Sequence, residues 1–112
     1  MENNYVYINH IKEAMVKIKK YLMGVSYEEF AKNSLLIDGV VRELEIIGEA
    51  ANNIEQSFKD KHREVPWLKI RGMRNSLIHE YFGVDINIVW NTCEDDLPRL
   101  NKIINGLLKD NR

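Results

Sequence analysis

Residues 41–58 read VRELEIIGEAANNIEQSF, and this stretch decides that the chain is helical. Small or apolar side chains recur at intervals of three and four residues, the spacing of one face of an α-helix. These side chains are Val41, Leu44, Gly48, Ala51, Ile54 and Phe58. The spacing predicts one long helix from near Lys32 to near Phe58. Because Gly48, Ala50 and Ala51 are small, a second helix could approach closely at that level.

The same periodicity continues toward both ends of the chain. The N-terminal stripe is Ile8, Ile11, Met15, Ile18 and Leu22, and the C-terminal stripe is Trp90, Cys93, Leu97, Leu100, Ile104 and Leu107. Gly24 is positioned to end the first helix. Pro98 lacks the backbone N–H that a helix interior needs, so it should kink or split the last helix.

Local signals mark the remaining helix ends. Ser26 and Glu29 have the spacing of a capping box, in which each side chain bonds the other residue's free backbone amide. Pro66 suits the first turn of a third helix, Gly83 is a plausible stop, and Asp85 is a plausible cap for the last helix. The sequence therefore predicts an all-α fold, an up-and-down bundle of four main helices with a kinked last helix, in a single domain spanning residues 1–112.

Composition excludes several classes of protein. The 112 residues are 45% hydrophobic and 29% charged, as in a folded domain with one core. The one cysteine, Cys93, precludes an internal disulfide and fits a reducing compartment. No signal peptide and no apolar run of the ~20 residues needed to cross a bilayer is present, so we expect a cytoplasmic protein without membrane contact. Zinc-type Cys/His spacing and a Gly-rich phosphate loop are absent, and we expect no metal and no cofactor.

Positive charge is concentrated in one part of the chain. The net charge is −1, which argues against a tight, dedicated nucleic-acid binder. The basic residues between positions 59 and 74 are Lys59, Lys61, Arg63, Lys69, Arg71 and Arg74, against Asp60 and Glu64 alone. For Lys59–Arg63, a solvated surface and a phosphate-binding role are equally compatible with the sequence. A phosphate-binding role is favoured for Arg71 and Arg74, which adjoin the motif below.

Residues 71–85, RGMRNSLIHEYFGVD, carry the candidate chemistry. An imidazole, His79, can transfer a proton near neutral pH. A guanidinium, Arg74, can hold a phosphate by paired hydrogen bonds. Together they indicate acid–base cleavage of a phosphodiester. Asn75 lies one turn before His79 and could fix the tautomer of its ring, or could equally be a surface amide.

The spacing Arg74-x4-His79-x-Tyr81 resembles the signature of the HepT-like toxin ribonucleases of the HEPN superfamily. Further similarity lies at Trp67, Ile70, Gly72-Met73, Asn75, residues 80–83 and residues 44–51. The resemblance runs from end to end and implies a HEPN-like bundle with Arg74 and His79 as catalytic residues on an RNA substrate. It also implies a homodimer with the site at the interface, and a cognate antitoxin, a minimal nucleotidyltransferase, that attaches AMP to Tyr81.

Helical geometry exposes a difficulty at this site. At about 100° per residue, Ile70, Met73 and Leu77 share the side that should face the core. Arg74 and His79 are then about 140° apart and do not automatically meet. The arginine could reach round, the helix could bend near its end, or a second protomer could complete the site.

Alternatives to a ribonuclease remain compatible with the sequence. One is a non-catalytic partner subunit that binds nucleotide or substrate for a nucleotidyltransferase, and another is a structural dimerisation bundle. Arg74 could instead form a salt bridge with Asp38 or Glu45. Asp38, Arg42 and Glu49 lie on the predicted long helix, where they could line the cleft that holds the candidate active site or simply face solvent.

Overall fold

The computed structural model describes residues 3–79 and 85–110, without the side chains of Ile78 and His79. Every regular element in these ranges is helical, so the predicted all-α fold is confirmed. The elements are α1 (Asn4–Leu22), α2 (Tyr27–Lys32), α3 (Ser34–Asn53), α4 (Gln56–Lys61), α5 (Trp67–His79), α6 (Ile86–Asn91), the π-helical turn η1 (Thr92–Asp96) and α7 (Leu97–Asp110). None of these helices is long and apolar enough to cross a bilayer.

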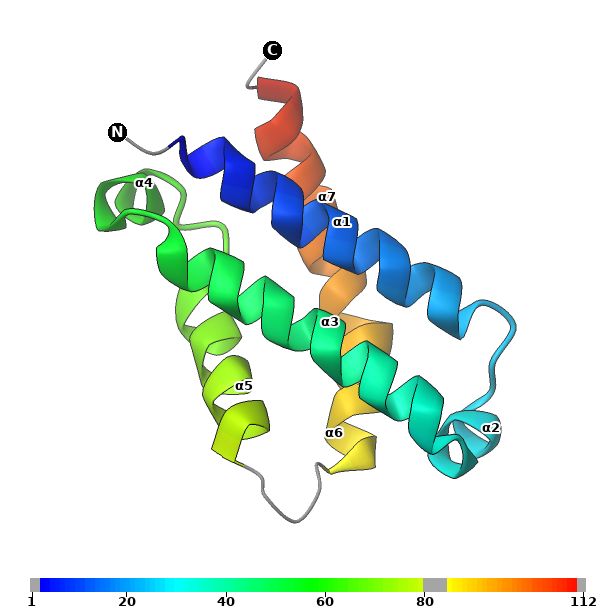
Figure 1. Cartoon of the computed structure of the whole chain (residues 1–112). Coiled ribbons are helices and arrows are strands. Elements are labelled where there is room, and N and C mark those ends of the chain that lie inside the picture. The colour runs from blue at the N-terminus through cyan, green and yellow to red at the C-terminus, as the bar shows by residue number, and fades with distance from the viewer. Residues whose placement is uncertain (1–2, 80–84, 111–112) are drawn as a thin grey trace.

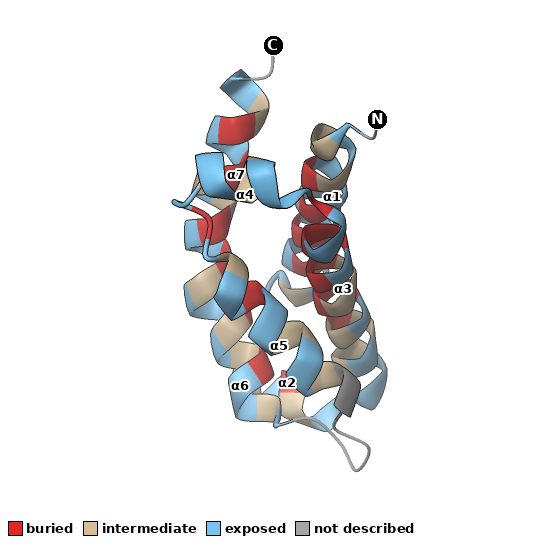
Figure 2. Ribbon diagram, turned by 90° about the vertical axis from the view of Figure 1, so that its left-hand side faces the viewer, coloured by how far each residue is buried: buried red, intermediate tan, exposed pale blue. Residues whose placement is uncertain are grey.

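The helices form two layers. α1 and α3 lie side by side and run antiparallel, and α5 runs antiparallel to the segment formed by α6, η1 and α7 (Figure 1). The buried side of the first layer faces the buried side of the second (Figure 2). Each layer therefore covers the apolar stripe of the other, as an up-and-down arrangement of four main helices requires.

The core confirms the predicted stripes. Ile8 and Ile11 of α1, Leu44 and Ile47 of α3, and Ile104 of α7 are each no more than 1% exposed. Burying each such side chain contributes roughly 1.5–3 kcal/mol. The two layers are thus held together mainly by apolar contact between residues far apart in the sequence.

The predicted caps are also present. The Ser26 hydroxyl accepts from the Glu29 amide at 3.2 Å, and the Glu29 carboxylate accepts from the Ser26 amide at 3.0 Å. The bond from the Ser26 backbone lowers the pKa of the Glu29 carboxyl. The Asp85 carboxylate caps α6 by accepting from two backbone amides. Gly24, at φ +72°, adopts the left-handed conformation that follows many helix ends.

The predicted end of the long helix near Phe58 is wrong. α3 ends at Asn53, Ile54 is extended, and α4 begins two residues later. The Asn4 side chain accepts from the Glu55 amide at 3.0 Å and donates to the Glu55 carboxylate at 3.3 Å. These hydrogen bonds to the start of α1 stabilise the break between α3 and α4. Because Asn4 and Glu55 are far apart in the sequence, no local pattern predicts the contact.

The last helix is split, as the proline predicted. The π-helical turn η1 precedes Pro98, which occupies the first turn of α7. The Leu97 amide donates to the carbonyl of Thr92, five residues earlier, and the Thr92 hydroxyl donates to the Ile88 carbonyl at 2.7 Å. The wider turn supplies partners where proline interrupts the regular ladder.

Candidate active site

The part of the motif up to His79 lies on α5, whose core side is as predicted. Ile70 is buried, and Met73 and Leu77 are half-buried against the core. At the start of the helix, the Trp67 indole N–H donates to the His62 carbonyl at 3.0 Å. These contacts fix the rotation of α5 and therefore the direction in which its polar residues point.

Arg74 packs its aliphatic stem directly against Gly48 of α3. A Cβ added at Gly48 would lie 2.4 Å from the Arg74 Cβ and 2.8 Å from its Cγ. Any side chain at that position would therefore force α3 or α5 to shift. The prediction that small residues admit a second helix is confirmed, and the second helix is the one that bears the motif.

The guanidinium of Arg74 is only weakly satisfied. Its Nε is buried and has no hydrogen-bond partner among the residues that the structure describes. One terminal nitrogen donates to the Asn75 side-chain oxygen at a long 3.5 Å. Within residues 3–79 and 85–110 it forms no ion pair, so the alternative salt bridge to Asp38 or Glu45 is not found. A partly buried cation with free donors is suited to receiving an anion.

The other predicted site residues are placed as follows. Arg71 and Asn75 are exposed, one turn before Arg74 and next to it respectively. His79 is the last residue of α5, which is α-helical throughout, so the angular offset of about 140° from Arg74 is retained at its backbone. The His79 side chain and Tyr81 lie outside the described residues, as does the predicted stop at Gly83.

Three charged residues of α3 share an exposed face. Asp38, Arg42 and Glu49 are spaced by four and seven residues, which places them within about 40° of one another. Gly48, which marks the side in contact with Arg74, lies about 80–120° away. Neither carboxylate is within ion-pair distance of Arg74 in the described structure.

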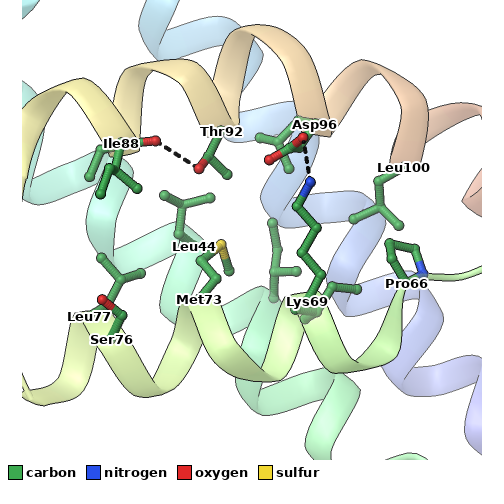
Figure 3. Close-up of a pocket in the computed structure, with 14 residues that line it drawn as sticks. Leu44, Pro66, Lys69, Met73, Ser76, Leu77, Ile88, Thr92, Asp96 and Leu100 are labelled. Atoms are coloured by element: carbon green, nitrogen blue, oxygen red, sulfur yellow. Dashed lines mark hydrogen bonds and ion pairs between the residues drawn. The ribbon is translucent and has the colours of Figure 1, made fainter.

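An apolar pocket of about 300 Å³ adjoins the core side of α5. Met73 and Leu77 line it from α5 and Leu44 from α3, and the ion pair between Lys69 and Asp96, at 3.0 Å, spans it to η1 (Figure 3). Arg74 does not line this pocket. The pocket therefore belongs to the interior between α5 and α6–α7 and not to the motif.

A second, more polar cleft of about 570 Å³ lies between the end of α3, α4 and the start of α5. Arg71 lines it, and Gly48 lies in its wall, so it adjoins the stem of Arg74. The sequence showed the basic run but not this cleft. The contact between Gly48 and the stem of Arg74 was likewise not predicted, although the small size of Gly48 indicated that some group could pack closely there. No group of three or more potential metal ligands occurs among the side chains that the structure describes.

Comparison with known proteins identifies the family of the chain. The family model described as "Ribonuclease HepT-like" matches residues 11–107. "Putative RNase TTE0752" of Caldanaerobacter subterraneus subsp. tengcongensis is 43% identical, over 92% of each chain. "Probable ribonuclease HepT" of Thermococcus cleftensis is 42% identical, over 84% of this chain and 86% of that protein. No solved structure gives a significant match. A family model that covers nearly the whole chain, including the helix that carries Arg74 and His79, shows that the chain belongs to the HepT-like ribonuclease family.

Proposed function

We propose that the protein is a metal-independent endoribonuclease that uses the RNA's own 2′-hydroxyl as nucleophile. The observation that carries the proposal is that Arg74 is firmly packed while its guanidinium has few hydrogen-bond partners in the described part of the chain. Its stem is held against Gly48, its Nε is buried without an acceptor, and its guanidinium forms no ion pair in the described part of the chain. An RNA phosphate would supply the missing acceptors.

In this mechanism, the 2′-oxygen forms a bond to the adjacent phosphorus while the bond from phosphorus to the 5′-oxygen breaks. His79 accepts the proton from the 2′-hydroxyl and returns it to the leaving 5′-oxygen. Arg74 stabilises the negative charge that grows on the phosphoryl oxygens, and Asn75 and Arg71 support its position and charge. The products are a 2′,3′-cyclic phosphate and a 5′-hydroxyl. DNA lacks the 2′-hydroxyl and should resist cleavage.

The protein is proposed to act as a homodimer. The backbone positions of Arg74 and His79 are about 140° apart around a continuous helix, which favours a site to which two copies of α5 contribute. A two-fold dimer would bring two copies of the polar strip to one cleft. Arg74 from one protomer and His79 from the other could then act on the same bond.

The proposed biological role is that of a toxin in a toxin–antitoxin pair. The antitoxin would be a minimal nucleotidyltransferase that attaches AMP to Tyr81, two residues after His79. A bulky anion there would cover the site and repel RNA. RNA and such a partner would be met in the cytoplasm, which is the compartment we propose.

Cleavage of RNA by the purified protein in EDTA tests the chemistry. Activity should persist and leave cyclic phosphate ends, because Arg74 and His79 supply charge and proton transfer. His79→Ala should abolish cleavage and retain the helical circular dichroism spectrum. His10→Ala is the matched control, since His10 is exposed on α1 and is not part of the motif. Full activity of His79→Ala, or a strict requirement for Mg²⁺ in the wild type, would rule the mechanism out.

A further inference from the structure

The polar cleft beside α5 contains cations that the proposed reaction does not use. Lys59 and Arg63 line it together with Arg71 and Lys69, and Asp60 is the acidic residue among its described lining. Asp60 accepts a hydrogen bond from Gln56 at 2.9 Å, and Lys69 is paired with Asp96. We refer to this hollow as the basic cleft.

Three of these cations have no acidic partner. Across residues 3–79 and 85–110, the ion pairs are His62 with Glu64 and Lys69 with Asp96. Lys59, Arg63 and Arg71 therefore line the cleft without forming an ion pair within the described chain. Most cations on a protein surface are simply solvated, so the positioning of these three decides whether they form a site.

Lys59 is held in place. Its ammonium lies over the Trp67 ring, 5.8 Å from the centroid, and that ring is fixed by its bond to the His62 carbonyl. Burial lowers the pKa of the Lys59 ammonium, and the positive charge of Arg71 lowers it further. The effect of Arg71 on this pKa shows that the two cations repel each other, and an anion bound in the cleft beside them would relieve that repulsion.

The basic cleft is continuous with the proposed active site. Gly48 lines the cleft and also contacts the stem of Arg74, and Arg71 lies one helical turn before Arg74. Along the axis of α5, Trp67 and Arg74 are about 10 Å apart, roughly the length of three stacked nucleotides. A strand whose cleaved phosphate lies at Arg74 can therefore extend into the cleft, toward Lys59 of α4.

We propose that the basic cleft binds the backbone of single-stranded RNA two to three nucleotides from the cleaved bond. The proposal rests on the proposed ribonuclease function and extends it to the substrate. Lys59 and Arg63 position the strand and do not take part in the chemistry. An oligonucleotide should consequently be a much better substrate than a dinucleotide that contains the same cleavable bond.

The test compares two substrates. The bond that the wild type cleaves is first mapped on a long RNA. Kinetics are then measured on the dinucleotide that contains this bond and on a 12-nucleotide RNA that contains the same dinucleotide. Lys59→Gln/Arg63→Gln should raise the KM for the 12-mer roughly tenfold, as expected for the removal of two exposed ion pairs. It should leave kcat/KM for the dinucleotide unchanged. The plot of log(kcat/KM) for the 12-mer against log salt concentration should have a negative slope that is about 1.4 less steep than in the wild type, because each phosphate that is no longer neutralised reduces its magnitude by ~0.7.

Lys61→Gln is the matched control, because Lys61 is an exposed lysine of α4 that does not line the cleft. Circular dichroism verifies that each variant is folded. The proposal is overturned if the double variant cleaves the 12-mer as well as Lys61→Gln does, or if it loses activity equally on both substrates.

Failure of the proposed function is recognisable separately. A wild type that cleaves neither substrate is not the ribonuclease proposed above. Binding of a 12-mer with 2′-deoxy sugars then still tests the cleft. Weaker binding by the double variant than by Lys61→Gln supports the cleft, and equal binding overturns it.

Discussion

Replacing Gly48 by alanine tests the contact that positions Arg74. The added methyl group would lie 2.4 Å from the Arg74 Cβ, 2.8 Å from its Cγ and 3.0 Å from its Cδ. Since the Cβ is anchored to the backbone, α5 or α3 must shift to accommodate it. Overpacking of this kind costs about 1–3 kcal/mol. Alanine in place of glycine within a helix contributes about 0.8–1.0 kcal/mol in the opposite direction. We therefore expect a net destabilisation of about 0–2 kcal/mol.

The controls are Gly72→Ala and Gly106→Ala. Both residues lie in helices, and a Cβ added at either would have no neighbour within 4 Å. Each control should gain the helix contribution alone, about 0.8–1.0 kcal/mol. The difference between Gly48→Ala and either control isolates the clash, and at about 4 °C per kcal/mol for a chain of this length it corresponds to about 4–12 °C in Tm.

The assays are thermal unfolding followed by circular dichroism and RNA cleavage at a temperature where every variant is folded. Gly48→Ala should lose most of its activity, because displacement of α5 moves the Arg74 guanidinium. Gly106→Ala, on α7, should cleave as the wild type does. If Gly48→Ala gains stability as the controls do and remains fully active, α3 and α5 are not packed as described and the reasoning fails.

Four further outcomes are expected. Arg74→Lys should lose most RNA cleavage although it keeps the charge, because an ammonium does not reproduce a bidentate guanidinium fork on phosphate; a fully active lysine variant would contradict that role. Tyr81→Phe should remain an active ribonuclease but escape inactivation by the cognate nucleotidyltransferase with ATP, and intact mass should show added AMP on the wild type only; AMP on the variant would place the modification elsewhere. Light scattering should give a dimer at micromolar concentration, and a monomer would argue against a shared cleft. Burial, and then Glu94, raise the pKa of the Cys93 thiol to about 12, so the folded protein should react with a thiol reagent at pH 8 only on unfolding. An unfolded Cys93 thiol ionises near its ordinary pKa of 9.0. The contribution of the neutral, buried thiol to stability is therefore intact below pH 9 and is lost as the pH rises toward 12. Rapid labelling of the folded protein at pH 8 would contradict the burial of Cys93.

Local sequence signals were reliable where the structure depends on neighbours in the chain. The Ser26–Glu29 capping box and the Asp85 cap connect residues no more than three apart, and both are present. The apolar stripes predicted the core because helical spacing alone determines which side chains share a face. The spacing of Arg74 to His79 matched the family signature, and the family is confirmed, whereas the catalytic role of Arg74 stays a prediction.

Features that depend on distant contacts were not predictable in this way. The break after α3 is held by Asn4 and Glu55, which are 51 positions apart. The basic cleft needs the end of α3, the whole of α4 and the start of α5 to be in place before its cations share one hollow. The prediction for Gly48 was incomplete for the same reason. Its small size indicated that another helix could approach closely, but not that Arg74 would be the residue in contact with it.

The bond between Asn4 and Glu55 has a practical consequence for handling the protein. It ties the beginning of α1 to the beginning of α4, whereas the end of α5 points to the opposite end of the molecule (Figure 1). A bulky affinity tag fused before residue 1 would consequently sit close to α4 and could obstruct a long oligonucleotide. It would leave the end of α5 open to a partner enzyme. A tag with a cleavable linker is therefore the appropriate choice for kinetic work, while an uncleaved one is adequate for testing capture of the proposed partner enzyme.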